Sequence, residues 1–163
     1  YVSLIDLGSV AESKFLRETM EAAVMKLACQ QFPGEALAEL EANIAMQEAC
    51  LTEKNYVRFF GLDEALHRLI FSGCNKVRIW NMMQQMHAHY NRVRRLNIAG
   101  GYDVWTTMEQ HKTMVRAIRG QDVILGVSTM NLHLNKVNID INDLLNDYGQ
   151  YFRQTAQRTP EIR

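Results

Sequence analysis

Glycine and proline, the residues that most often end a helix, are sparse in this chain, and the stretches between them have helical length. The 163 residues include two prolines and nine glycines. From residue 9 to 32, apolar residues recur at steps of three and four, which is typical of an amphipathic helix, and later stretches repeat this spacing. Signals for strands are almost absent. The pattern predicts six helices, at about residues 9–32, 35–51, 52–72, 75–98, 104–119 and 121–151.

Capping residues and connection lengths extend this prediction to a fold. Ser9, with Glu12 three residues later, forms a capping box at the start of the first helix. Asn75 is the expected cap of the fourth helix, and Gly61 is a point at which the third could break. Short connections favour antiparallel neighbours. We therefore expect an all-α fold, an antiparallel bundle of six to seven helices.

Charge and cysteine usage narrow the class of protein. Eighteen basic residues balance eighteen acidic ones, so the formal net charge is zero, whereas sequence-independent binding of nucleic acid needs an excess of positive charge. No apolar run approaches the roughly 20 residues of a membrane span. Cys29, Cys50 and Cys74 are odd in number and form no CxxC pair, which fits a reducing compartment. We expect a cytoplasmic domain that does not itself bind nucleic acid.

Four residues on three predicted helices form a candidate metal-ligand set. Asp63 and His67 are four residues apart, so they project from one helix face. His111 and His133 each lie beside apolar residues of a later helix. If these faces point into the bundle, three imidazoles and one carboxylate can bind a divalent metal in a central cavity and leave positions open for another ligand. Zinc is the first choice, with nickel, iron or manganese as alternatives.

Plainer interpretations exist for the same residues. An Asp/His pair at this spacing is more often an ordinary side-chain pair, and a single histidine on an apolar face is more often a core residue than a ligand. His87 and His89 are two residues apart and cannot share a helix face, so neither joins the ligand set. The nine methionines lie mostly on apolar stripes and are interpreted as core residues.

Basic residues supply candidates for binding an anion. Arg92, Arg94 and Arg95 cluster in HYNRVRRLN, and Arg17 lies beside the apolar stripe of the first helix. Such a run is usually a solvated face. The alternative is that some of the guanidinium groups turn inward and bind a small anion near the metal. Arg17 is the better candidate, and Arg92 and Arg95 complete the expected effector-binding set.

The same residues carry a family resemblance. The string FLRETMEAAVMKLA resembles the first helix of the FadR C-terminal ligand-binding (FCD) domain of GntR-type bacterial transcription regulators. FFGLDEALHRLIFSGCN, EQHKTMVRAIRGQD and STMNLHL are similar to three further segments of that family, in the same order and spacing. The sequence departs from the pattern at Leu66, where Phe is common, at Gly126, where Ala is common, and at Gln110 and Gln121, which interrupt two dipeptides.

The resemblance implies a function and a place in a longer protein. By it, Asp63, His67, His111 and His133 are the metal ligands, and Arg17 faces the carboxylate of a small organic or sugar acid. Residues 1–8 are then the end of a linker from an absent N-terminal winged helix-turn-helix domain, residues 9–152 form the FCD domain, and residues 153–163 are a polar tail. DNA would be bound only through that other domain, and a homodimer is expected.

Three functions are therefore weighed. The first is an effector-sensing domain with no enzymatic activity, whose metal and acid change DNA binding by the rest of the protein. The second is a metal-dependent hydrolase or lyase that uses the same Asp/His3 site. It lacks an obvious general base, because Glu64 and Glu109 are predicted to point away from the ligand faces. The third is a metal-free helical interaction domain.

Overall fold

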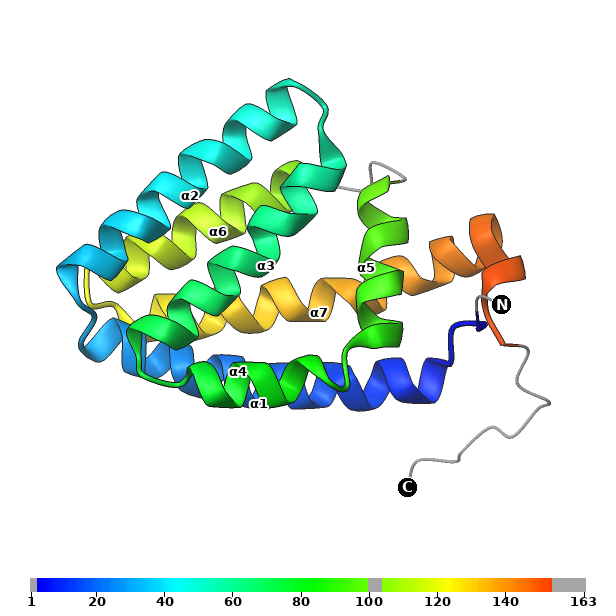
Figure 1. Ribbon diagram of the computed structural model, residues 1–163, viewed down its shortest axis with the longest axis horizontal. Coiled ribbons are helices and arrows are strands. Elements are labelled where there is room, and N and C mark those ends of the chain that lie inside the picture. Colours follow the sequence, from blue (N-terminus) through cyan, green and yellow to red (C-terminus); the bar gives the residue numbers. More distant parts are fainter. Residues whose placement is uncertain (1–2, 100–103, 154–163) are drawn as a thin grey trace.

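The computed structural model describes residues 3–99 and 104–153, without the side chains of residues 98–99 and 136–141. Within this part of the chain the fold is all-α, as predicted (Figure 1). None of its helices has the length and apolar character needed to cross a membrane. The elements are α1 (Leu7–Gln30), α2 (Gly34–Thr52), α3 (Tyr56–Gly73), α4 (Val77–Gln84), α5 (Ala88–Ala99), α6 (Val104–Arg119), α7 (Val123–Tyr148) and a final 3-10 turn, η1 (Gly149–Tyr151).

The two longest helices form one side of the bundle. Helix α1 packs along α7, and α2 packs against both α3 and α6 (Figure 1). Helices α3 and α6 also contact α1, while α5 crosses α1 and α7 steeply in the view of Figure 1. Helices α3, α6 and α7, which carry the predicted metal ligands, therefore all pack against α1.

A large apolar core holds α1, α2, α3, α4, α6 and α7 together. Methionine fills much of it, as the sequence predicted, because an unbranched side chain fits irregular gaps. Met25, Met83, Met114 and Met130 are buried in it, whereas Met46, Met82 and Met86 are exposed. The main cluster also contains Leu40, Leu66, Ile70, Phe71, Trp80, Ile118 and Leu134.

The first and last described segments meet at one end of the molecule. The Ile5 N–H donates to the Tyr151 carbonyl (2.8 Å), and the Arg153 N–H donates to the Ile5 carbonyl (2.8 Å). Ile5 and Phe152 are buried together with residues of α1, α5 and α7 in a second apolar cluster. The start of α1 is thus held against the end of α7. The predicted polar tail lies, apart from Arg153, outside the described residues.

Several predicted helix ends are wrong by a few residues. The N-cap of α1 is Asp6, whose Oδ1 accepts from the Ser9 N–H (2.8 Å), so Ser9 lies inside the helix. Asn75 does not cap α4: its φ is 57°, a left-handed conformation that often follows a helix C-terminus, and Lys76 holds the N-cap position. Helix α3 continues through Gly61 without a break.

The predicted helix at 75–98 is two helices. Helix α4 ends at Gln84 and α5 begins at Ala88, with N–H groups between them bonding three residues back, from Met86 to Met83 and from His87 to Gln84. Ser13 of α1 donates to the Met86 carbonyl (2.6 Å), which gives that carbonyl a partner outside the helix. The break changes the direction of the chain, so that α5 can cross the bundle.

Candidate metal centre

The four predicted ligands converge between α3, α6 and α7. Asp63 and His67 lie one turn apart on α3, and His111 and His133 face them from α6 and α7. All four are buried, and one ligand atom from each can be chosen so that the four atoms lie within 4.8 Å of one another. The apolar residues beside each of them on its helix explain this placement, because burying those residues turns the polar ones inward as well.

The distances between ligand atoms suit a small metal ion. The Nε2 atoms of His67 and His133 are 3.2 Å apart, and His67 Nε2 is 3.5 Å from Asp63 Oδ1. Two nitrogen ligands of tetrahedral zinc lie roughly 3.3 Å apart. His111 Nε2, 4.0 Å from Asp63 Oδ2, is buried and has no hydrogen-bond partner among the described residues. These residues therefore fit a divalent metal, and a buried imidazole nitrogen without a partner is what such an ion would satisfy.

A second set of side chains orients the three imidazoles. Each Nδ1 faces a side-chain oxygen: His67 faces Glu21 Oε2 at 2.5 Å, His111 faces Gln47 Oε1 at 2.8 Å, and His133 faces Gln110 Oε1 at 3.0 Å. An amide or carboxylate oxygen accepts, so Nδ1 carries the proton in each ring. The Nε2 lone pairs are then left to point at the shared centre, as in proteins that bind metals through histidine.

Electrostatics keep the ligands in the states that metals bind. Burial lowers the pKa of His111 to about 3, and it lowers the pKa of His133 well below its usual value, an effect the neighbouring imidazoles increase. Burial alone would raise the pKa of Asp63, but Arg94, followed by the three histidines, holds it below its usual range. At neutral pH the imidazoles of His111 and His133 are therefore neutral, and the Asp63 carboxylate is ionised.

Arg94 of α5 is the basic residue that reaches the ligands. Its Nη2 donates to Asp63 Oδ1 (2.5 Å), and its Nη1 donates to Glu64 Oε1. Its guanidinium carbon lies 5.0 Å from the Phe60 ring centre and 5.9 Å from that of Tyr90. Arg94 thus holds Asp63 in place and leaves Oδ2 on the side of His111.

Arg17 of α1 lies behind His67. Its Nε donates to Glu21, whose other oxygen contacts His67, and its guanidinium carbon lies 5.2 Å from the Tyr90 ring centre. Arg17 is 1% exposed, and its Nη2 is buried without a hydrogen-bond partner among the described residues. The side chain is therefore inside the bundle, and one of its donor groups is free to bind another molecule.

Arg92 and Arg95, the other two predicted effector-binding residues, contact other parts of the molecule. Arg92 donates to the Ser3 carbonyl, and Arg95 is exposed, with its guanidinium carbon 5.0 Å from the Phe60 ring centre. The structure brings Arg94, which lies between them in the sequence, to the ligand set instead. Arg94 points in a different direction from Arg92 and Arg95 because α5 presents successive residues about 100° apart.

Sequence reasoning missed the residues that orient the ligands. Gln47 and Gln110 had no assigned role, Arg94 was named only within the basic cluster, and Glu21 was present only as a letter of the string FLRETMEAAVMKLA that carries the resemblance. Gln47 lies four residues after Asn43, whose Oδ1 accepts from its Nε2, and this i, i+4 pair of amides on an otherwise apolar stripe was a signal. Gln110 is one of the departures from the family pattern. Its contact with His133 gives that departure a structural role.

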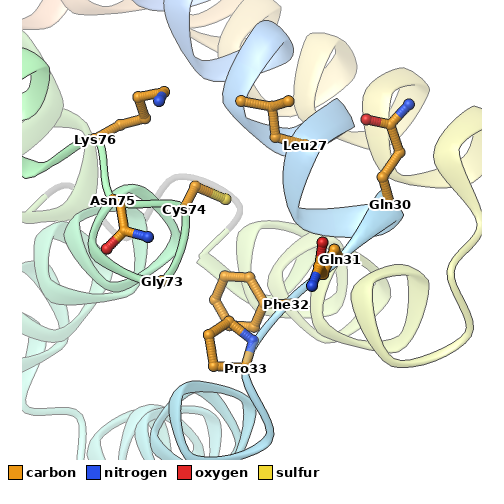
Figure 2. A pocket seen from close by; sticks show the side chains of 9 residues that line it. All are labelled: Leu27, Gln30, Gln31, Phe32, Pro33, Gly73, Cys74, Asn75 and Lys76. Atoms are coloured by element: carbon orange, nitrogen blue, oxygen red, sulfur yellow. The ribbon is translucent and has the colours of Figure 1, made fainter.

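A surface pocket of about 600 Å³ lies apart from these ligands, between the α1–α2 connection and the α3–α4 connection (Figure 2). The Phe32 ring projects into it, and Cys74 lines the opposite side. Cys74 Sγ donates to the Val24 carbonyl (3.7 Å), and burial raises the pKa of its thiol. None of the predicted site residues lines this pocket. The metal-ligand set is therefore the stronger candidate site.

A family model matches most of the helical bundle. The FCD domain family matches residues 14–136, a segment that contains Arg17, all four ligand residues and Gln110. The chain belongs to the FCD domain family.

Proteins similar to this chain carry the names of transcription regulators. An uncharacterized HTH-type transcriptional regulator in an unstable DNA locus of Streptomyces ambofaciens is 27% identical over 163 residues, which is all of this chain and 68% of that protein. The HTH-type transcriptional repressor RspR of Escherichia coli K12 is 22% identical over 154 residues, 94% of this chain and 68% of its own. The uncharacterized HTH-type transcriptional regulator YdfH of Shigella flexneri gives the same values.

Proposed function

We propose that this chain is the effector-sensing domain of a transcription regulator. Asp63, His67, His111 and His133 would bind a divalent metal, and a small carboxylate or sugar acid would bind beside it. DNA would be bound by a helix-turn-helix domain elsewhere in the protein. Family membership and the names of the relatives support the regulatory role. Effector and DNA affinities would then be coupled reciprocally.

One observation carries the metal assignment. Three imidazoles from three helices direct their Nε2 atoms to one place, and each is oriented by an acceptor at Nδ1. A core that merely packed its histidines would gain nothing from leaving His111 Nε2 unpaired, because a buried polar atom without a partner costs about 1–3 kcal/mol. Zinc is the expected ion for three nitrogens and one oxygen, with nickel, iron or manganese as alternatives.

The position of Arg17 supports an anionic effector. It is a buried cation whose Nε donates to Glu21, which contacts His67, and whose Nη2 has no hydrogen-bond partner among the described residues. A carboxylate that bound the metal could also accept from Arg17 Nη2. The carboxylate would then bind the metal and the guanidinium group at the same time.

The carboxylates near the site favour sensing over catalysis. Glu21 is ion-paired with Arg17, and Glu64 is ion-paired with Arg94. Burial alone would raise the pKa of both carboxyls, but their arginine partners hold it below the usual range, so both are weak bases. A metal-dependent hydrolase would need another base among these helices.

Metal content tests the site. The purified wild type should hold about one divalent ion per chain, measured by inductively coupled plasma mass spectrometry. The double variant His111→Ala/His133→Ala should hold almost none, while His89→Ala, whose ring instead accepts from the Asp6 N–H, should match the wild type. Equal metal content in the double variant and the wild type would sink the assignment.

Two further measurements test the regulatory role. A regulator that contains this domain should change its DNA affinity when a stabilising organic acid is added, and the purified, metal-loaded chain should not turn that acid over. Turnover would favour the hydrolase or lyase instead. Sedimentation equilibrium tests the homodimer that the family resemblance implies.

A further inference from the structure

His87 is a buried histidine that the metal site does not use. It lies at the junction between α4 and α5 and is 1% exposed. Neither ring nitrogen has a hydrogen-bond partner among the described residues. Leaving both nitrogens of one imidazole unpaired is costly, because each loses its bond to water on folding. A polar group from another molecule would offset that cost.

His87 lies near Arg17, a residue of the proposed effector site, and the ring of Tyr90 is close to both. The His87 ring centre is 6.0 Å from that of Tyr90, and the Arg17 guanidinium carbon is 5.2 Å from the same Tyr90 ring centre. Among the described residues, Arg17 Nη2 is also buried without a hydrogen-bond partner. The imidazole of His87 and the guanidinium group of Arg17 thus both lie within about 6 Å of the Tyr90 ring centre, which places them near enough for one molecule to contact both.

The position of His87 relative to Arg17 is fixed by a hydrogen bond. Ser13, one turn before Arg17 on α1, donates to the carbonyl of Met86, the residue just before His87 (2.6 Å). Ser13 is itself buried. This bond holds the α4–α5 junction against the face of α1 that carries Arg17. It therefore fixes the position of His87 relative to Arg17.

The chemistry of the ring restricts what it can recognise. Burial, followed by the positive charge of Arg17, lowers the pKa of His87 to about 4, so the ring is neutral at physiological pH. A neutral imidazole has one N–H donor and one acceptor nitrogen. A carboxylate can only accept and an ammonium group can only donate, whereas a hydroxyl group can do both.

We propose that His87 binds a hydroxyl group of the effector while Arg17 Nη2 and the metal bind its carboxylate, so that the domain selects hydroxylated organic acids over unsubstituted ones. The inference rests on the proposed function and narrows it, because a metal and an arginine alone would accept any small carboxylate. His87 is then a specificity-determining residue.

The test compares acids that differ only in hydroxyl groups. Dissociation constants of the metal-loaded chain are measured by calorimetry for gluconate against hexanoate and for lactate against propionate. The wild type should bind at least one hydroxylated acid tenfold or more tightly than its partner, roughly the effect of one or two well-made hydrogen bonds. His87→Leu should abolish that preference and leave the affinity for the unsubstituted acid unchanged.

Matched variants separate recognition from folding. His87→Gln retains a donor and an acceptor and should recover part of the preference. His89→Leu removes a histidine two residues away, whose Nδ1 accepts from the Asp6 N–H, and should leave the preference intact. Metal content is measured for every variant and should not change.

The outcomes distinguish this inference from the proposed function. A chain without metal contradicts the proposed function. A metal-loaded chain that binds both members of each pair equally, or that binds no hydroxylated acid, contradicts the role of His87 alone. A crystal structure of the gluconate-soaked or lactate-soaked chain in which His87 bonds only to water would also overturn it.

Discussion

Gln47 is a neutral side chain that contacts a residue of the proposed metal site without being a candidate ligand itself. Its Oε1 accepts from His111 Nδ1, and its own Nε2 donates to Asn43 Oδ1 (2.7 Å). This arrangement selects the tautomer of His111 whose Nε2 faces the other ligands. Partners of this kind contribute a factor of about 10–100 to metal affinity in other proteins.

Replacing Gln47 should therefore weaken metal binding without touching a ligand. We expect Gln47→Leu to raise the zinc dissociation constant by roughly 10–100-fold, measured by competition with a chromophoric chelator. Gln47→Glu restores an acceptor at the same place and should bind zinc at least as well as the wild type. If the two variants bound zinc equally, orientation by residue 47 would have no role.

His87 predicts a pH dependence of stability. Its pKa is about 4 in the folded chain and 6.5 for an unperturbed histidine, so between these values the unfolded chain binds more protons. The contribution of His87 to the free energy of unfolding is therefore fully present above about pH 7. It falls as the pH drops from 6.5 towards 4, by at most about 1.4 kcal/mol per pH unit.

The measurement compares wild type with His87→Gln, both metal-free, by urea unfolding from pH 4 to 8. The wild type should lose stability relative to the variant as the pH falls through this range. Above pH 7.5 the difference between the two should be constant. A difference that did not change between pH 4 and 6.5 would mean that the ring is not held neutral.

At the scale of single residues, the four candidate ligands that the structure brings together were predictable from the sequence, and the side chains that contact them were not. Asp63 and His67 follow from i, i+4 spacing, and His111 and His133 from their apolar neighbours. Arg94 could not be separated from Arg92 and Arg95, because the choice depends on how α5 is rotated. That rotation is set by contacts with α1, α3 and α7, which lie far away in the sequence.

At the scale of elements, the contact of α1 with α7 depends on a glycine, which has no side chain. Gly126 of α7 faces α1, and a Cβ atom added there would lie 2.5 Å from Cys29 Sγ. Cys29 is fully buried, so its sulfur has little room to move. Gly126 is one of the sequence's departures from the family pattern, in which alanine is common, and Cys29 occupies the space that an alanine methyl group would need.

Because of this contact, we expect Gly126→Ala to have opposite effects on stability in the wild type and in a chain that carries Cys29→Ala. Gly126→Ala should gain about 1 kcal/mol from helix propensity but lose about 1–3 kcal/mol to overpacking, a net loss in the wild type. In a Cys29→Ala background the overpacking disappears, and the same substitution should stabilise the chain. Urea unfolding of the four proteins measures this. Equal effects in both backgrounds would contradict close packing at this point.

The break between α4 and α5 shows what element prediction lacked. Apolar spacing continues from residue 77 to 93, and neither glycine nor proline interrupts it, so a single helix was the natural expectation. The chain turns because Met83 and Gln84 accept i+3 bonds and because Ser13 takes the Met86 carbonyl. A tertiary hydrogen bond from a residue 73 positions away leaves no local signal.

For the whole molecule, α7 joins the metal site to the terminal contact. It carries His133 near its middle and ends beside Phe152, which packs with Ile5 at the entry to α1. Helix α1 in turn carries Arg17, Glu21 and Ser13. The same two helices thus connect Glu21, which contacts His67, and His133 with the contact between Ile5 and Phe152.

If the proposed metal site is coupled to the contact between Ile5 and Phe152, the stabilisation of the chain by metal should depend on that contact. Zinc at 100 times its dissociation constant adds about 2.7 kcal/mol to the stability of a chain that binds it only when folded. Phe152→Ala should itself cost about 3–5 kcal/mol, because it removes a buried ring. Independent sites would give additive effects, whereas coupling through α1 and α7 should reduce the zinc contribution in the variant by about 0.5–2 kcal/mol.

The control must lie in a part of the core that α1 and α7 do not form. Leu51 belongs to a separate cluster with residues of α3 and α6, so Leu51→Ala should lower stability while leaving the zinc contribution nearer its wild-type value. Unfolding of wild type and both variants, with zinc and with a chelator, measures the coupling. Zinc contributions reduced equally in Phe152→Ala and Leu51→Ala would reflect a general loosening of the bundle, and equal contributions in all three proteins would mean that the terminal contact does not sense the metal. A reduction confined to Phe152→Ala would identify α1 and α7 as the connection.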